Sequence, residues 1–230
     1  MDAPHDMGGT QGYGPIVQEA EHEQAGLGHF HEDWEKRVLG MSALVIGAGI
    51  VSIEQARYAR ERQFPANYLT RSYWETWLYG LVLNLIETKT VTADEMIKMG
   101  LITQEELDMA LKLRADALAE PIAEITPKPE TPRFRVGDAV RSITQRPSGH
   151  TRETHYSRGH VGVIEYVYDA DDPAQEAART YADVRGTTGK DEKQWLYSVR
   201  FKASELWGIH ADNSGYVYVN MWEPYLEPAE

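Results

Sequence analysis

The sequence contains no cysteine among its 230 residues, although its composition is otherwise that of an ordinary globular protein, with 42% apolar residues. This absence excludes a disulfide scaffold, a thiolate metal site, an iron–sulfur cluster and a cysteine nucleophile, because each of them needs sulfur. No apolar run approaches the ~18 residues of a membrane span, and the segment MDAPHDMGGTQGYGP lacks the charged and apolar regions of a signal peptide. We therefore expect a soluble, cytoplasmic protein that has no membrane partner.

Positive charge is also scarce. The chain has 23 lysines and arginines against 36 acidic residues, which gives a formal net charge of -13. Such a balance repels a phosphate backbone, so we expect no nucleic-acid partner. Several familiar catalytic motifs are missing as well: a phosphate-binding glycine loop, a glycine-flanked nucleophilic serine, and a helical histidine pair with a glutamate between them. The sequence therefore indicates no self-contained active site.

The composition changes along the chain and divides it into four parts. Residues 1–29 are rich in glycine and poor in aliphatic residues, so we expect an extended arm there. Residues 30–118 show helical periodicity, residues 119–132 form a proline-rich linker, and residues 133–230 have the pattern of strands. This order predicts an α+β fold in two parts: an arm with a helical domain, then a carboxyl-terminal SH3-like small β-barrel.

Helix starts are marked in the second part by hydroxyl residues with Glu or Gln three positions later. This is capping-box spacing, in which the two side chains satisfy each other's backbone amides. The four pairs are Ser52 with Gln55, Ser72 with Glu75, Thr92 with Glu95, and Thr103 with Glu106. An earlier helix is predicted from the apolar series Phe30, Trp34, Val38, Met41 and Val45.

Two features refine the prediction for the middle of the helical part. Pro65 separates the second helix from the third. The third helix, roughly residues 73–88, has an apolar face that includes Tyr73, Trp77 and Leu81 and extends over the neighbouring row. A face this broad indicates burial on more than one side.

Strands are predicted where β-branched and aromatic residues run between glycine-containing turns. The segments are FRVGDAVRSI, HVGVIEYVYD, WLYSVRF and GYVYVNMW. In the third of these, Tyr197, Val199 and Phe201 share one face of the strand. Residues 169–193 are rich in Asp, Ala, Gly and Thr, which predicts a long insertion between two strands.

Two arginines are candidates for binding an anion. Arg57 lies in SIEQARYARERQ, on a helix next to the aromatic one, and Arg152 lies in the polar loop PSGHTRETHYSRGHVG. Arginine presents a planar fork of donors to oxyanions and keeps its charge. An ordinary surface or salt-bridged role is the alternative for both. The histidines near these segments do not predict a metal site, because two-residue spacing on a helix points the rings apart.

Several stretches, taken together and in order, resemble the β subunit of nitrile hydratase. They are DAPHDMGGTQGYGP, FHEDWEK, IEQARYARERQFPANYLTRSYWETW, GHTR followed by YSRGHVG, and ELWG with NMWEPYLEP. The resemblance covers nearly the whole chain and implies a lyase that adds water to a nitrile to form an amide. It further implies that the enzyme is active only as a complex with an α subunit, in a heterodimer or heterotetramer. The arm at residues 1–29 is then expected to wrap around the α subunit.

The resemblance also implies where the chemistry lies. The family's α chain holds a low-spin cobalt(III) or iron(III) in a cysteine cluster whose thiolates are partly oxidised, so this chain is expected to bind no metal or cofactor itself. Trp77 favours cobalt over iron. Two β-chain arginines of the family donate hydrogen bonds to the oxidised sulfurs, and the matching positions are Arg57 and Arg152. A pocket for a small nitrile is implied at Ile53, Ala56, Tyr73 and Trp77.

Three alternatives stay open at this point. A thiocyanate hydrolase-type subunit has the same kind of cobalt site, but there the two halves lie on separate chains, and continuity across Pro132 argues against it. A non-enzymatic metallochaperone or activator of the same system resembles only the helical half and needs neither the barrel nor Arg152. A free-standing barrel that binds nucleic acid is disfavoured by the negative charge, and no feature of the sequence supports one that binds peptide.

Overall fold

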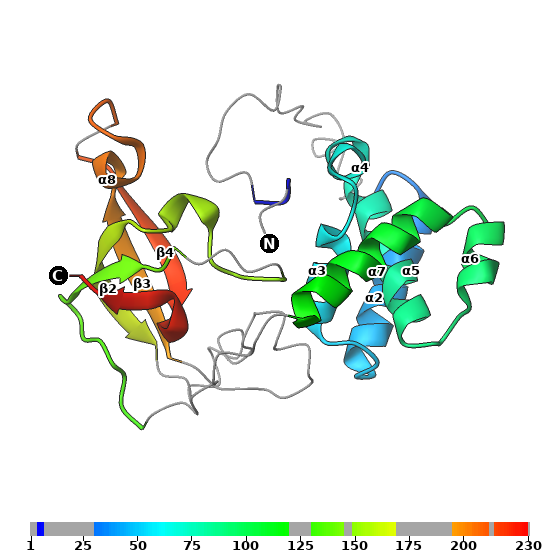
Figure 1. Cartoon of the computed structure of the whole chain (residues 1–230), viewed down its shortest axis with the longest axis horizontal. Helices are drawn as coiled ribbons and strands as arrows, with labels where there is room; N and C mark the ends of the chain where they lie inside the picture. Colours follow the sequence, from blue (N-terminus) through cyan, green and yellow to red (C-terminus); the bar gives the residue numbers. More distant parts are fainter. Residues whose placement is uncertain are drawn as a thin grey trace. The chain divides into compact units, whose positions relative to one another are not determined.

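The computed structural model describes residues 4–6, 30–119, 130–144, 149–168, 195–211 and 214–229. The predicted insertion at residues 169–193 and nearly all of the arm and linker lie outside this part of the chain. The protein divides into two compact units, a helical one at Ala3–Ala115 and a second one made of Met1–Asp2 and Asp116–Glu230. Helices and strands are segregated in the sequence, which is the predicted α+β arrangement (Figure 1).

The helical unit contains six helices in the described part of the chain. They are α2 (Asp33–Gly47), α3 (Ile53–Glu61), α4 (Pro65–Thr70), α5 (Tyr73–Glu87), α6 (Ala93–Lys98) and α7 (Gln104–Ala119). All four predicted capping boxes are present, at the starts of α3, α5, α6 and α7. The short helix α4 was not predicted. Pro65 begins it, because the first helical position needs no N–H donor.

Helix α5 forms the centre of this unit. Its residues from Tyr79 to Asn84 are all buried, which confirms the prediction that this helix is covered on more than one side. The prediction was wrong for Tyr73, which is 65% exposed because it lies at the first position of the helix. It was also wrong for Met41 of α2, since the buried face of that helix passes instead through Val38, Ser42 and Val45.

A buried arginine ties three of these helices together. The guanidinium of Arg62, which is 1% exposed, donates to both carboxylate oxygens of Glu87 at 2.6 and 3.1 Å. It also donates to the carbonyl oxygen of Ala110 in α7 at 3.0 Å. The Tyr79 hydroxyl donates to the carbonyl oxygen of Arg62 at 3.1 Å, and burial raises the pKa of Tyr79 to about 12. These bonds fix the end of α3 on α5 and α7.

The second unit contains a five-stranded antiparallel sheet with the order β4-β3-β2-β1-β5. The strands are β1 (Ala139–Ser142), β2 (Val161–Tyr168), β3 (Leu196–Lys202), β4 (Tyr216–Trp222) and β5 (Leu226–Pro228), with α8 (Ala203–Trp207) after β3. β1 to β4 match the four segments predicted as strands, and β5 lies outside those segments. Tyr197, Val199 and Phe201 are fully buried in the core, as the alternation in β3 predicted. Between described residues, β4 and β5 are not paired, so closure into an SH3-like barrel stays a prediction.

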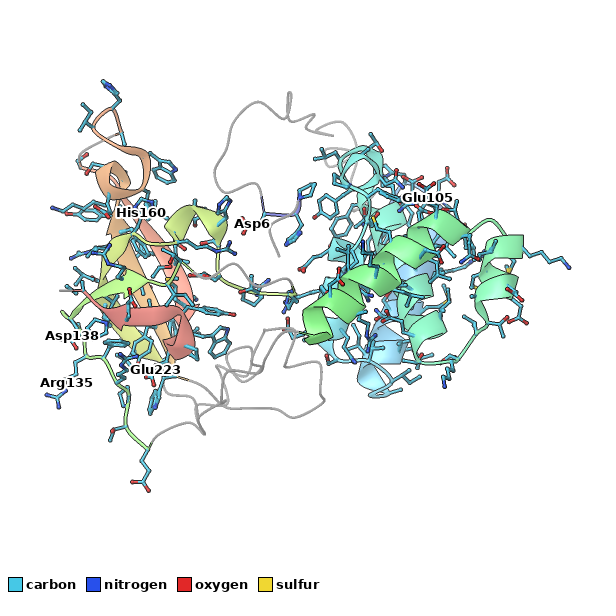
Figure 2. All side chains as sticks on the ribbon, in the orientation of Figure 1. Asp6, Glu105, Arg135, Asp138, His160 and Glu223 are labelled. Atoms are coloured by element: carbon cyan, nitrogen blue, oxygen red, sulfur yellow. The ribbon has the colours of Figure 1, made fainter. Side chains whose placement is uncertain are left out.

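Two carboxylates shape the entry into this sheet (Figure 2). Asp138 accepts a hydrogen bond from the backbone N–H of Arg135 at 2.8 Å and so closes the turn before β1. Glu223 accepts from the backbone N–H of Arg133 at 2.9 Å and from the Tyr197 hydroxyl. Burial, together with the carboxylate of Glu223, raises the pKa of Tyr197. The segment before β1 is therefore anchored to residues about ninety positions later.

None of the helices in the described ranges is long and apolar enough to span a membrane.

Candidate functional site

Helix α3 carries the first candidate arginine. The helix starts at Ser52, whose hydroxyl accepts from the backbone N–H of Gln55 at 3.1 Å while the Gln55 side chain accepts from the Ser52 N–H at 2.7 Å. Arg57 Nη1 donates to Glu54 Oε1 at 2.6 Å. The Arg57 side chain is 35% exposed, whereas that of Glu54 is only 2% exposed. Arg57 is therefore held in orientation by a buried carboxylate while part of its guanidinium faces outward.

Only one of the Arg57 donor groups is used in this contact. Arginine has five N–H donors, and among the described residues Glu54 is the acceptor that Arg57 contacts. The remaining donors suit a planar anionic group that comes from outside the described chain.

A second arginine on the same helix was missed by the sequence analysis. Arg60 lies one turn after Arg57, and its Nε donates to the carbonyl oxygen of Ala56 at 2.8 Å. Its guanidinium carbon lies 3.9 Å from the centroid of the Trp77 ring. Burial lowers the pKa of Arg60 below its usual value. The available sequence signal was the three-residue spacing from Arg57, which puts both arginines on neighbouring positions of one helix face.

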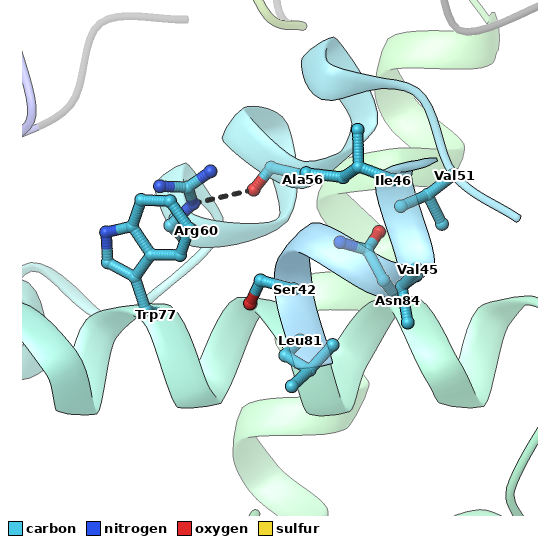
Figure 3. A pocket seen from close by; sticks show the side chains of 10 residues that line it. Ser42, Val45, Ile46, Val51, Ala56, Arg60, Trp77, Leu81 and Asn84 are labelled. Carbon is cyan, nitrogen blue, oxygen red and sulfur yellow. Dashed lines mark hydrogen bonds between the residues drawn. The ribbon is translucent and has the colours of Figure 1, made fainter. Parts of the chain in front are cut away.

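A small pocket lies beside this arginine, between α2, α3 and α5 (Figure 3). Its free volume is about 10 Å³, room for about one water molecule. The lining residues are Ser42, Val45, Ile46, Val51, Ala56, Arg60, Trp77, Gly80, Leu81 and Asn84.

The structure brings together two of the four predicted pocket residues. Ala56 and Trp77 both line the pocket, but Ile53 and Tyr73 do not. Ile53 is 42% exposed at the start of α3. Tyr73 is exposed too, and its ring centroid lies 5.8 Å from that of Trp77. Ile53 and Tyr73 are therefore surface residues, and each occupies the first position of its helix.

The second candidate, Arg152, lies on a loop of the sheet unit and is exposed. The hydroxyl of Tyr225 accepts from the backbone N–H of Arg152 at 3.3 Å and from the Thr151 hydroxyl at 3.4 Å. The next residue, Glu153, is buried and accepts from the Ser142 hydroxyl at 2.7 Å. Glu153 also pairs with Arg158 at 3.2 Å, whose side chain is 5% exposed. The loop backbone is thus fixed on both sides of Arg152, and its side chain projects outward.

A larger hollow in the helical unit is less suited to binding. It has a volume of about 740 Å³ and includes Asn67, Arg71 and Glu106 in its lining. These polar side chains satisfy one another: Glu106 Oε1 accepts from Asn67 at 2.8 Å and from Arg71 at 2.5 Å. Arg71 also donates to Gln63 at 2.8 Å. The Asn67, Arg71 and Glu106 side chains are therefore engaged with one another and with Gln63.

A resident metal does not fit the side chains of this chain. The whole sequence lacks cysteine, and within the ranges that the structure describes no three His, Asp or Glu side chains gather in a way that could hold a metal ion. Two arginines on rigid supports can bind and orient an anionic group, but they supply neither a nucleophile nor a metal ligand.

Comparison with known proteins gives matches along the whole chain. The family model described as "Nitrile hydratase beta subunit, N-terminal" matches residues 1–135, and the model described as "Nitrile hydratase beta subunit, C-terminal" matches residues 123–228. The low-molecular weight cobalt-containing nitrile hydratase subunit beta of Rhodococcus rhodochrous is 33% identical, with 100% of both chains covered. The nitrile hydratase subunit beta of Rhodococcus erythropolis is 34% identical, again with 100% of both chains covered.

Two further similarities were found. The cobalt-containing nitrile hydratase subunit beta of Pseudonocardia thermophila is 29% identical, with 99% of this chain and 96% of that relative covered. Among solved structures, recombinant apo-thiocyanate hydrolase from Thiobacillus thioparus is 28% identical over 44% of this chain and 78% of that one, with a TM-score of 0.34. A TM-score this low does not bear on the fold.

Proposed function

The chain belongs to the nitrile hydratase beta-subunit family, and we propose that it works with a separate α subunit in a complex that hydrates nitriles to amides, a lyase reaction. The observation that carries this proposal is that both family models match one continuous chain in order. A metallochaperone or activator similar to the helical half alone would not require the second match.

The metal of this complex is assigned to the α subunit. This chain has no cysteine, and its described residues hold no ligand cluster. Two similar relatives are named cobalt-containing, which favours cobalt over iron. When bound in the partner, such a metal acts as a Lewis acid that polarises the nitrile or the attacking water.

The role proposed for this chain is to orient anionic groups of the partner. Arg57 and Arg152 each donate hydrogen bonds to an oxygen of an oxidised cysteine in the α subunit. The planar arginine fork matches such an oxyanion. The Arg57–Glu54 contact of 2.6 Å supports this role, because a guanidinium fixed before binding loses less conformational entropy on binding.

The pocket proposed for the nitrile is formed by Ile53, Ala56, Tyr73 and Trp77, of which Ala56 and Trp77 line the small pocket of the helical unit. The proposed assembly is a heterodimer or heterotetramer. Its parts are an arm at residues 1–29 around the α subunit, a helical domain at 30–118, a linker at 119–132 and an SH3-like barrel at 133–230. Apolar side chains form most of the wall of this pocket, and Ser42, Arg60 and Asn84 are its polar members.

Expression of the chain with and without its α subunit tests the proposal. The chain alone should contain no stoichiometric cobalt or iron and should form no amide, because it lacks the ligands. The co-expressed pair should purify as one metal-containing assembly that converts acrylonitrile to acrylamide. Metal and activity in the chain alone would overturn the assignment, as would an assembled, metal-loaded pair that forms no amide.

A further inference from the structure

Three contacts fix the side chain of Arg60 in the helical unit. Its Nε donates to the carbonyl oxygen of Ala56 at 2.8 Å, and its guanidinium carbon lies 3.9 Å from the Trp77 ring centroid. The third contact is made by the aliphatic stem, which lies against Gly80 of α5. A Cβ at position 80 would be 2.5 Å from Arg60 Cγ, so only glycine leaves room for the stem.

Arg60 contacts both Ala56 and Trp77, the two predicted substrate-pocket residues that line the small pocket. Arg60 is bonded to the backbone of Ala56 and covers the ring of Trp77, as Figure 3 shows. The other aromatic neighbours of the Trp77 ring are less close, with centroid distances of 5.5 Å to Trp74 and 5.8 Å to Tyr73. A guanidinium over an indole face is attracted through its charge, and arginine also offers a planar surface that lysine lacks. Arg60 is therefore the contact that restrains the indole face.

We propose that Arg60 is a positioning residue that fixes the Trp77 indole and thereby limits the size of the nitrile that the pocket accepts. The inference rests on the proposed function, in which Trp77 lines the substrate pocket. Beside the held indole the pocket has room for about one water molecule, so only the slender end of a small nitrile fits there while the indole stays in place. A larger substituent on the nitrile needs the indole to move, and the stacked guanidinium opposes this movement.

Three variants of the αβ complex separate the contributions of Arg60. Arg60→Met keeps an unbranched stem but removes the guanidinium, and Arg60→Lys keeps the charge but removes the planar face. Gly80→Ala changes neither partner and displaces the Arg60 stem through the new Cβ. Arg37→Met, at an exposed position of α2, is the matched control for the loss of one arginine.

The first measurement is the ratio of kcat/KM for benzonitrile to that for acrylonitrile. We expect Arg60→Met and Gly80→Ala to raise this ratio by about tenfold, the scale on which an apolar pocket discriminates one methylene group. Arg60→Lys should also raise this ratio, because the lysine charge without a planar group does not hold the indole ring. Arg37→Met should leave it unchanged. An equal loss of rate for both nitriles would show that Arg60 is only structural and would overturn the proposal.

The second measurement does not depend on activity. In a complex labelled with 5-fluorotryptophan, the ¹⁹F resonance of Trp77 is identified by its loss in Trp77→Phe. Arg60→Met should shift this resonance, whereas Arg37→Met should not. An unmoved resonance would refute the contact itself, and a moved resonance with an unchanged substrate ratio would refute its role in selectivity. If even the unsubstituted, metal-loaded complex hydrates no nitrile, the proposed function fails and the size limit fails with it. The ¹⁹F resonance still shows in that case whether Arg60 contacts Trp77.

Discussion

The helical unit and the sheet unit support their candidate arginines in different ways. Arg57 stands on a helix, and its guanidinium is held by Glu54, three residues earlier on the same helix. Arg152 stands on a loop, and its backbone is held by the hydroxyl of Tyr225, 73 residues later. The first arrangement follows from local helix geometry, whereas the second exists only once the sheet unit has folded.

This difference has a consequence for how each position responds to substitution. A helix keeps its backbone when one surface side chain is lost, because the backbone hydrogen bonds of neighbouring turns remain. A loop has no such ladder and depends on a few side chains, here Tyr225 and the buried Glu153. We therefore expect the Arg152 loop to be the more fragile of the two.

The largest effect is expected from Glu153→Gln. Arg158, whose side chain is 5% exposed, would lose the charge of Glu153 in a buried site, which should lower the free energy of unfolding by about 3 to 5 kcal/mol. The matched variant Glu54→Gln should cost only about 1 kcal/mol, because Arg57 is exposed enough to be hydrated. Urea unfolding of the complex measures both. Equal losses in the free energy of unfolding would show that Glu153 and Glu54 stabilise their units to the same extent.

Arg57→Lys and Arg152→Lys should each lower turnover on a small nitrile by a factor on the order of 10², or about 2.7 kcal/mol. This is the scale on which a preorganised donor stabilises charge, and lysine loses the two-pronged geometry. Metal content and assembly, measured in parallel, should not change. Near-native turnover with metal and assembly intact would leave both arginines as structural residues.

A smaller effect is expected on acidification of the helical unit. Burial raises the pKa of Glu106, but hydrogen bonds from Thr103 and the charge of Arg71 outweigh burial and lower this pKa below its usual 4.5. The contribution of Glu106 to stability is therefore complete above pH 4.5 and is lost as the pH falls through the lower native pKa. Glu106→Gln should cost on the order of 1 kcal/mol at neutral pH and flatten the stability profile between about pH 5 and 3.

Unfolding of the complex across this pH range provides the measurement for Glu106. Glu205 of the sheet unit is the matched carboxylate, since a backbone hydrogen bond from Val161 lowers its pKa but its side chain is 41% exposed. Glu205→Gln should flatten the profile less than Glu106→Gln. A stronger flattening by Glu205→Gln would contradict the conclusion that the buried hydrogen bonds of Glu106 contribute more to the pH dependence of stability.

The smallest effect is expected from Tyr225→Phe. The hydroxyl accepts two long hydrogen bonds, at 3.3 and 3.4 Å, so its loss should cost less than about 1 kcal/mol of stability. Turnover should nevertheless fall more than in Tyr218→Phe, an exposed tyrosine of the same unit, because the backbone of Arg152 is released. Steady-state kinetics of the two variants decides this. Identical turnover would mean that the hydroxyl does not position the loop.

Much of the helical unit could be predicted because its signals are local. A capping box involves residues three positions apart, and all four of those predicted are present. Strand alternation also correctly placed Tyr197, Val199 and Phe201 in the core. The short helix α4 and the short strand β5 were missed, since the first begins at a proline taken as a separator and the second has only three residues.

The candidate site was harder to predict. Residue chemistry singled out Arg57 and Arg152 and the family resemblance gave them a role, while the pocket contains the predicted Ala56 and Trp77. The spacing from Arg57 places Arg60 on the same helix face, but it does not show that Arg60 contacts Trp77, because the Arg60 stem needs the empty space over Gly80, on another helix. The anchoring of Glu153 by Ser142 was likewise hidden, since it joins a loop to a strand.

The sequence by itself determined where helices start, which strand face is apolar and that this chain has no thiolate for a metal. These properties depend on residue types and on neighbours within one turn or one strand. Only the tertiary structure decided that Arg60 covers Trp77, that Glu153 is buried with Arg158, and that Tyr225 holds the Arg152 loop. Such contacts depend on the packing of separate elements, in which a missing Cβ or one distant hydroxyl fixes the position of a side chain.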